Sequence, residues 1–301
     1  MTMTDPTQLN ALLTRFDALL ARVEPLLPPA ITAPDWGAIA FRWRKPGGRR
    51  GWLEAVARPH LIRLDDLQGV EDQKTRLTQN TRQFVAGRTA NNVLLTGARG
   101  TGKSSLVKGV LQAFAKKGLR LIEVDKQDMT DLPEIVDLVA GRPERFIIFC
   151  DDLSFEANDP GYKALKSILD GSIAGTPENV LLYATSNRRH LMPEFMAENL
   201  ETHRVGDEIH PGETTEEKIS LSERFGLWLS FYPFDQDHYL AICEHWLTVF
   251  GLSASQIEAA RMEALQWTLM RGSRSGRVAW QFARDYAGRI KPAAVKAKKC
   301  S

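Results

Sequence analysis

The sequence has few cysteines, no long apolar run and little net charge. Its three cysteines, Cys150, Cys243 and Cys300, lie far apart without the spacing of metal ligands, which favours a reducing cytosol and argues against a zinc module. No uninterrupted apolar stretch approaches the length of a membrane span. The first residues lack the basic and apolar stretches of a signal peptide. We therefore expect a cytoplasmic protein without a membrane partner.

Charge and length set broad limits. A formal net charge of +2, with 25% charged and 43% hydrophobic residues, is that of an ordinary globular protein, and nothing in the overall charge demands nucleic acid. The 301 residues can form one large domain or two moderate ones. Composition thus does not indicate a function, and the functional prediction has to rest on sequence motifs.

The most informative motif lies at residues 92–105, N-V-L-L-T-G-A-R-G-T-G-K-S-S. Its apolar run predicts a short buried strand, which leads through Gly-x-x-x-x-Gly-Lys-Ser into a helical stretch at 105–117. Glycines let backbone N–H groups surround a polyphosphate at a helix N-terminus, where lysine reaches the phosphates and serine binds Mg²⁺. We predict that the chain binds a nucleoside triphosphate and Mg²⁺. The predicted contacts are Gly97, Ala98, Arg99, Gly100, Thr101, Gly102, Lys103, Ser104 and Ser105, with Ser104 also a metal ligand.

Strand and helix patterns alternate around this motif. Apolar runs at 119–124, 146–150 and 180–184 predict further strands, helical patterns lie between them, and 227–231 supplies a fifth strand. Such alternation predicts an α/β fold with a parallel sheet and helices on both faces. We expect 204–219 to be a surface loop. Helical patterns at 239–250, 255–270 and 276–290 then predict a separate all-α part.

The first sixty residues are less regular. Helical periodicity at 9–27 stops at a cluster of prolines, and an aromatic–basic segment follows between Trp36 and Trp52. Its tryptophans can pack on the main domain, or the segment can track a nucleic-acid backbone. The expected organisation is an N-terminal region at 1–60, a nucleotide-binding domain at 61–234, a helical lid at 235–290 and a disordered basic tail at 291–301.

Polar residues follow two of the predicted strands. The run F-I-I-F-C ends in Asp151 and Asp152, and the next strand leads to Asn187. Ligands bind at the carboxyl edge of an open parallel sheet, so Asp151 is placed to hold Mg²⁺ and Asp152 to orient or deprotonate an attacking water. Asn187 can hydrogen-bond that water or the γ-phosphate.

Two arginine motifs remain. Arg224 in S-E-R-F-G precedes the fifth strand, and its guanidinium can stabilise charge on a transferring phosphoryl group, often from a neighbouring subunit. Arg274 and Arg277 belong to the run R-G-S-R-S-G-R at 271–277, which opens the last helical stretch, where a cation can contact nucleotide from the helical part. For each motif a surface ion pair is the alternative.

Taken in this order, these motifs resemble the AAA+ ATPases. The runs L-I-E-V-D-K, Y-A-T-S-N-R-R-H-L and L-S-E-R-F-G-L are similar to a bacterial AAA+ family of uncharacterised function, DUF815, over about residues 63–290. The resemblance implies a P-loop three-layer sandwich with a five-stranded parallel sheet and a helical lid, and ATP at the subunit interfaces of a homo-oligomer, often a hexamer. It also implies a Walker B motif ending at Asp152, sensor 1 at Asn187, an arginine finger at Arg224 and sensor 2 at Arg274 or Arg277.

The functional hypothesis is an Mg²⁺-dependent ATPase that acts on an unidentified protein or nucleic acid. Walker B motifs of AAA+ proteins usually end in Asp-Glu, whereas this one ends in Asp151-Asp152, and a shorter side chain puts the hydrolysis rate in doubt. A slow nucleotide-gated switch or loader is therefore the alternative. A small-molecule kinase is a weaker third hypothesis, because it leaves both arginine motifs unexplained.

Overall fold

The computed structural model describes residues 6–23, 33–45, 50–155, 159–170, 177–187, 203–205, 208–210 and 223–290. The chain divides into two units, Met1–Asp35 and Trp36–Ser301. The described part of the first unit is one helix, α1 (Pro6–Val23), and residues 33–35. The predicted tail at 291–301, with Cys300, lies outside the described residues.

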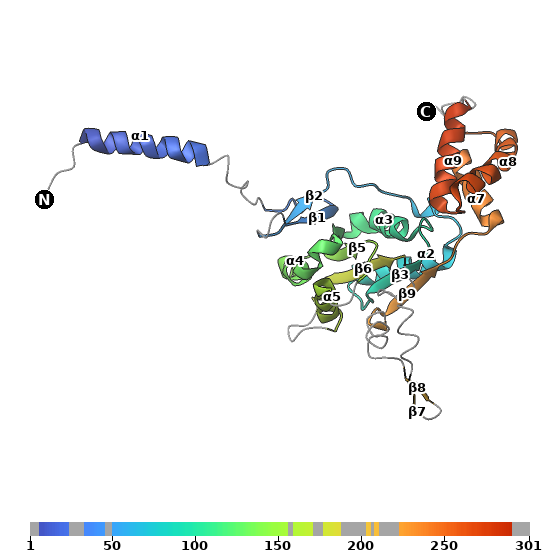
Figure 1. Ribbon diagram of the computed structural model, residues 1–301, viewed down its shortest axis with the longest axis horizontal. Coiled ribbons are helices and arrows are strands. Elements are labelled where there is room, and N and C mark those ends of the chain that lie inside the picture. Colours follow the sequence, from blue (N-terminus) through green and yellow to red (C-terminus); the bar gives the residue numbers. More distant parts are fainter. Residues whose placement is uncertain are drawn as a thin grey trace. The chain divides into compact units, whose positions relative to one another are not determined.

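The second unit is built on a mixed sheet (Figure 1). Its strands lie in the order β2-β1-β4-β5-β6-β3-β9, and every neighbouring pair is parallel except β1 with β2. The strand that leads into the phosphate-loop motif, β3, lies between β6 and β9. The bounds are β1 (Ala40–Arg44), β2 (Trp52–Ala55), β3 (Val93–Gly97), β4 (Leu119–Glu123), β5 (Arg145–Cys150), β6 (Val180–Ser186) and β9 (Leu227–Phe231).

The expected five-stranded sheet is therefore wrong in strand number, because the sheet has seven strands. The five expected strands are present, and the aromatic–basic segment adds β1 and β2 at one edge. Phe41 and Trp43 alternate with Arg42 and point into the core, where Phe41 and Trp43 are fully buried. Arg42 pairs with Glu123 on β4, 81 residues further along the chain. A segment as short as β1 becomes a strand because it pairs with a strand that is distant in the sequence, here β4.

The tryptophans of this segment pack against the domain. The Trp43 Nε1–H donates to Asp131 at 3.0 Å. The Trp36 ring lies 6.0 Å from the Phe146 ring, with the Arg142 guanidinium 3.7 Å from its centroid on the ring face. The packing interpretation of the segment therefore holds for both residues.

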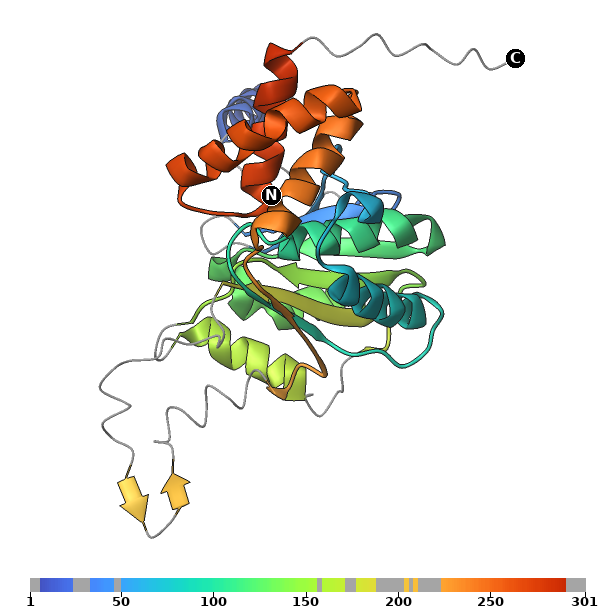
Figure 2. The same cartoon turned by 90° about the vertical axis from the view of Figure 1, so that its right-hand side faces the viewer.

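Helices cover both faces of the sheet (Figure 2). On one face, α2 (Glu71–Val85) and α3 (Lys103–Phe114) pack against Ile147 and Phe149 of β5. On the other, α4 (Leu132–Val139) and α5 (Pro160–Asp170) pack against Phe146 and Ile148. The side chains of β5 thus alternate between the two layers, as a strand buried on both faces requires. Short 3₁₀ turns are η3 (Leu64–Asp66), η4 (Ala115–Lys117) and η5 (Lys126–Asp131).

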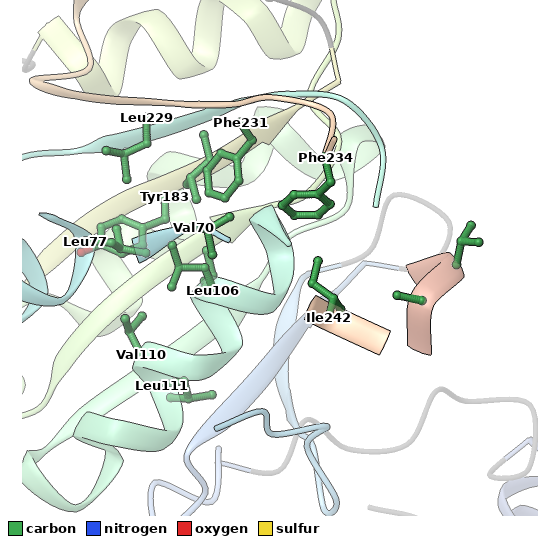
Figure 3. Packing of buried hydrophobic residues seen from close by; sticks show 14 of the residues in the cluster. Val70, Leu77, Leu106, Val110, Leu111, Tyr183, Leu229, Phe231, Phe234 and Ile242 are labelled. Carbon is green, nitrogen blue, oxygen red and sulfur yellow. The ribbon is translucent and has the colours of Figure 1, made fainter. Parts of the chain in front are cut away.

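The larger core continues from the sheet into the C-terminal helices. Figure 3 shows Leu106 and Val110 of α3 facing Tyr183 of β6 and Phe231 of β9. The same apolar cluster includes Ile242, so the helical part shares its core with the sheet. Tyr183 is part of this cluster, and its hydroxyl lies within hydrogen-bond distance, 2.9 Å, of the Thr81 hydroxyl.

The C-terminal residues form three helices where the sequence predicts helical stretches, and these helices are called the lid below. They are α7 (Gln236–Val249), α8 (Ala254–Arg271) and α9 (Gly276–Arg289), and they start within three residues of the predicted stretches. Each begins at a capping side chain: Asp235 accepts from the His238 N–H, Ser253 forms a capping box with Gln256, and Ser275 accepts from the Val278 N–H.

The region expected to be a surface loop at 204–219 contains strand structure. Two short strands, β7 (His203–Val205) and β8 (Glu208–His210), form an antiparallel pair. Residues 206–207 and 211–219 of the predicted loop lie outside the described residues. Among the described residues, no helix is both long and apolar enough to cross a membrane.

Candidate nucleotide-binding site

The phosphate-loop motif forms a tight turn between β3 and α3. Gly97 ends the strand with a φ of 134°, and a Cβ there would lie 1.9 Å from the carbonyl oxygen of Phe231. Gly100 has a φ of 77°, and a Cβ there would lie 2.8 Å from the Ser275 hydroxyl. Neither position can take a side chain without a shift of its neighbours, which explains glycine at the first position of the motif, Gly97, and at the variable position Gly100.

Lys103 is the first residue of α3 and is 6% exposed. Its ammonium group donates to the carbonyl oxygens of Gly97 at 2.7 Å and Ala98 at 2.8 Å, and to Asn187 Oδ1 at 3.0 Å. Burial lowers the pKa of Lys103, and the nearby carboxylates of Asp151 and Asp152 oppose this shift. The loop therefore holds a partly desolvated cation where phosphate would bind.

A second hydrogen-bonded group lies beside the lysine. Asp151 Oδ1 accepts from the Ser104 hydroxyl at 2.6 Å and from the Thr185 hydroxyl at 2.5 Å. A hydroxyl and a carboxylate are the oxygen ligands that Mg²⁺ prefers, so Ser104 and Asp151 fit this ion. The described residues contain no group of three or more His, Cys, Asp or Glu side chains that could hold a metal. A metal at this place would thus need further oxygen atoms from the nucleotide.

Asp152 is the only non-glycine residue with positive φ, 54°, in the described chain. Its backbone N–H donates to Thr185 Oγ1 at 2.9 Å, and its carboxylate accepts from Asn187 Nδ2 at 2.5 Å. Arg99 lies 3.7 Å from the same carboxylate. Short polar side chains tolerate the left-handed conformation better than long ones, which gives a backbone reason for aspartate here.

The lid reaches the phosphate loop at the start of α9. The Gly276 N–H donates to the carbonyl oxygen of Gly100 at 2.9 Å. Both arginines are exposed, but Arg277 lines the pocket around the loop, whereas Arg274, three residues earlier, does not. Of the two alternatives for a lid arginine at the nucleotide, the structure brings Arg277 to the loop.

These groups line one pocket of about 950 Å³. Asn187, Asp151 and Asp152 lie at its strand-end side, and residues of 60–70 form another wall. The lid contributes Trp246 and Trp280, and β6 contributes Thr185. These three residues are absent from the sequence prediction. Each lies in an ordinary helix or strand pattern, and only the tertiary arrangement brings them to the pocket.

Arg224 is not in this pocket. It lies just before β9, whose first residue pairs with Val93 at the start of β3, while Phe231 pairs with Gly97. Four residues of strand, about 13 Å, separate those two ends. The Arg224 guanidinium forms an ion pair with Asp170 at the end of α5. Within one chain, Arg224 therefore lies at the amino-terminal ends of β3 and β9, whereas the phosphate loop lies at the carboxyl end of β3.

Comparisons with known proteins identify one family. A family model described as "Protein of unknown function (DUF815)" matches residues 37–290. No curated protein matches the chain.

Solved structures resemble the chain at low sequence identity. The Thermotoga maritima RuvB Holliday junction branch migration motor gives a TM-score of 0.47 at 18% identity, covering 78% of this chain and 67% of that one. The AAA domain of FIGL-1 in complex with ADP gives 0.47 at 16%, covering 77% and 75%. The E. coli MS115-1 HORMA:CdnC:Trip13 complex gives 0.47 at 14%, covering 77% and 91%. The chain spans 66% of the length of a RuvB variant.

Proposed function

The chain belongs to the DUF815 family, and we propose that it is an Mg²⁺-dependent ATPase of the AAA+ type. The observation that supports this most is the joint position of a buried lysine, a Ser–Asp pair and an Asp–Asn pair at one glycine-rich loop. These are the three parts that phosphoryl transfer requires: a cation for the β- and γ-phosphates, a metal site and a group that positions water.

Binding would exchange partners around Lys103. Its ammonium group, now bonded to the Gly97 and Ala98 carbonyl oxygens, would donate to phosphate oxygens instead. Backbone N–H groups at the start of α3 add the partial positive charge of a helix N-terminus. Ser104 and Asp151 would hold Mg²⁺, which when bound neutralises negative charge on the phosphate oxygens. Trp246 and Trp280 provide aromatic surface in the same pocket for the base.

Hydrolysis would use Asp152 and Asn187. Asn187 orients the water, and the Asp152 carboxylate takes its proton as the water oxygen bonds to the γ-phosphorus. The bond from that phosphorus to the bridging oxygen breaks, and ADP leaves with the bonding electrons. For this step Asp152 must exchange its hydrogen bond with Asn187 for one with water.

Arg224 would act on the site of another copy. Its place at the end of the sheet away from the phosphate loop supports a role at a subunit interface of a homo-oligomer such as a hexamer, where it would stabilise charge on the phosphoryl group. The contact of Gly276 with Gly100 would pass the state of the loop to the lid. The resulting change of lid angle would act on a protein or nucleic-acid target.

The test is the steady-state ATPase rate against protein concentration. Wild type, Lys103→Ala, Arg224→Ala and a mixture of the two variants are compared. We expect specific activity to rise with concentration, each variant to be inactive, and the mixture to recover part of the activity, because one copy binds ATP and the other supplies Arg224. Activity that is independent of concentration and of Arg224 would overturn the shared site. Equal ATP binding by wild type and Lys103→Ala would overturn the nucleotide site.

A slow nucleotide-gated switch is the second candidate. The Asp152 carboxylate is already occupied by Asn187 and lies close to Arg99, which favours a low intrinsic rate. Turnover well above about 1 s⁻¹ by the protein alone lies in the usual enzyme range and would contradict the switch. Tight ATP binding with hardly any turnover would support it.

A further inference from the structure

The helix α1 carries a sequence repeat of seven residues. L-N-A-L-L-T-R at 9–15 is followed by F-D-A-L-L-A-R at 16–22. With 9 and 16 as heptad positions a, leucines occupy positions d and e of both heptads, and arginines occupy both positions g. A spacing of seven keeps one apolar stripe on one side of a helix, which is the pattern of helices that pack along their length.

The apolar stripe of α1 is exposed in the structure. Leu12, Leu13, Phe16, Leu19 and Leu20 are between 45% and 66% exposed. Five large apolar side chains on one helix face are more than isolated surface residues and form a surface for a partner.

We propose that α1 packs against α1 of other copies of this chain in a parallel helical bundle. A repeat in steps of seven matches an identical helix in register, since each residue at positions a and d then meets the equivalent residue of the other copy. A stripe of positions a, d and e is broader than a two-helix seam and suits a bundle of more than two helices.

The charges of α1 determine the parallel direction. In a parallel arrangement position g faces position e in the next heptad of the neighbour, so the Arg15 stem covers Leu20 of the neighbour and leaves its guanidinium group in water. An antiparallel pair would bring the arginine rows of two helices together, and like charges would repel. The polar side of α1 carries Asn10, Thr14 and Asp17 rather than a row of lysines, which argues against a membrane surface.

This association goes beyond the proposed ATPase, because it needs no nucleotide. An 18-residue helix pair is marginal alone, so the bundle would be weak and would act by raising the local concentration of the attached domains.

The test is sedimentation velocity of the full chain without nucleotide over about 1–100 μM. We expect concentration-dependent association by wild type, a loss of at least tenfold in apparent affinity for Leu12→Asp/Leu19→Asp, and no loss for the matched control Thr14→Asp/Ala21→Asp on the opposite side. Binding of a fluorescent ATP analogue, measured on all three proteins, should be unchanged. A wild type that stays monomeric, or a leucine variant that associates like wild type, would overturn the proposal whether or not the ATP site is correct.

Cysteine cross-linking tests the register. In a Cys300→Ser background, Leu19→Cys should form disulfide-linked dimers on mild oxidation, and Ala21→Cys should form at least tenfold fewer. Equal cross-linking of both would overturn the parallel bundle, as would monomeric protein that floats with vesicles of zwitterionic and anionic phospholipid through α1.

Discussion

Asp152 combines a constrained backbone with a side chain at the centre of the site. Its left-handed φ of 54° costs a residue with a Cβ roughly 1–2 kcal/mol, less for aspartate and asparagine, which bond locally. Glutamate would extend further toward a water but would lose that tolerance. Aspartate at position 152 therefore has a shorter side chain than glutamate, but it tolerates the left-handed backbone of the turn between β5 and the following loop.

Replacement of Asp152 separates these two properties. We expect Asp152→Asn to keep the fold and the affinity for ATP and to lower kcat by about 10²–10⁴, because only the proton acceptor is lost. Asp152→Glu should lower Tm by a few degrees through its backbone. Asp125→Asn, which removes a carboxylate from the loop after β4, is the control. ATPase assays and thermal unfolding measure both effects, and an active Asp152→Asn would contradict the assigned role.

Lys103 predicts how ATP affinity depends on pH. Burial lowers its pKa below 10.5 in the free protein, whereas bound phosphates favour the ammonium form and would raise that pKa again. Between the two pKa values binding takes up a proton, so affinity falls as pH rises through the pKa of the free protein and is unaffected by this group at lower pH.

Calorimetric titration in buffers of different ionisation enthalpy measures the proton uptake. We expect uptake to rise as the pH rises through the lowered pKa of Lys103, above the titration of the ATP phosphates. Lys103→Arg, whose guanidinium stays charged over this range, should show none of that rise. The same uptake in both proteins would assign the proton to another group.

At the scale of elements, the sequence predicts what is local and misses what is distant. β9 follows from its apolar run and the lid helices follow from helical periodicity, and the structure shows Asp235, Ser253 and Ser275 as the caps of these helices. β1 is missed because it becomes a strand by pairing with β4, and β2 by pairing with β1. The secondary structure of a short run with arginine at alternate positions cannot be predicted from the run alone, because it depends on the pairing of Arg42 with Glu123 of β4.

The same distinction applies to the site. Asp151, Asp152 and Asn187 could be predicted because each follows an apolar strand, and parallel strands end at one edge. Thr185 is part of β6, and Trp280 lies in an ordinary helix, so neither is distinguishable without its neighbours. The choice between Arg277 and Arg274 depends on where α9 begins, which Ser275 determines as its cap.

Contact between lid and loop gives a prediction for Gly100. Gly100→Ala would place its Cβ 2.8 Å from the Ser275 hydroxyl at a φ of 77°, and it should displace the start of α9. Gly118→Ala is the matched control, because its φ of 90° carries a similar backbone penalty while no atom lies within 4 Å.

Both variants should lose about 1 kcal/mol or more of unfolding free energy through the backbone. Only Gly100→Ala should also weaken ATP binding, by tenfold or more. Thermal unfolding and nucleotide titration measure the two effects. Equal ATP affinity in the two variants would show that the lid contact does not support binding.

At the scale of the whole molecule, the ion pair of Arg224 with Asp170 distinguishes assembly from local stability. The two side chains are 24% and 41% exposed, so their pairing contributes at most about 1 kcal/mol. If Arg224 only stabilised the local structure through this ion pair, replacement of Arg224 and replacement of Asp170 would affect the ATPase rate equally.

We expect Arg224→Ala to lower the ATPase rate by about 10³, the scale of an arginine finger, and Asp170→Asn to change it less than about threefold. Unfolding free energies should fall by similar small amounts in both. Rates measured per folded molecule check this, and an equal loss of rate in the two variants would assign Arg224 to local structure.

Two of the seven tryptophans, Trp246 and Trp280, line the nucleotide pocket, and both belong to the lid. Indole emission responds to polarity and to stacked rings, so nucleotide entry should change the intrinsic fluorescence of the protein. The intrinsic tryptophan fluorescence thus reports on nucleotide binding, and the Trp280→Phe variant would show whether Trp246 or Trp280 is responsible for the change in emission. Occupancy of the pocket and closure of the lid can be followed in real time, without a label and before any target of the protein is identified.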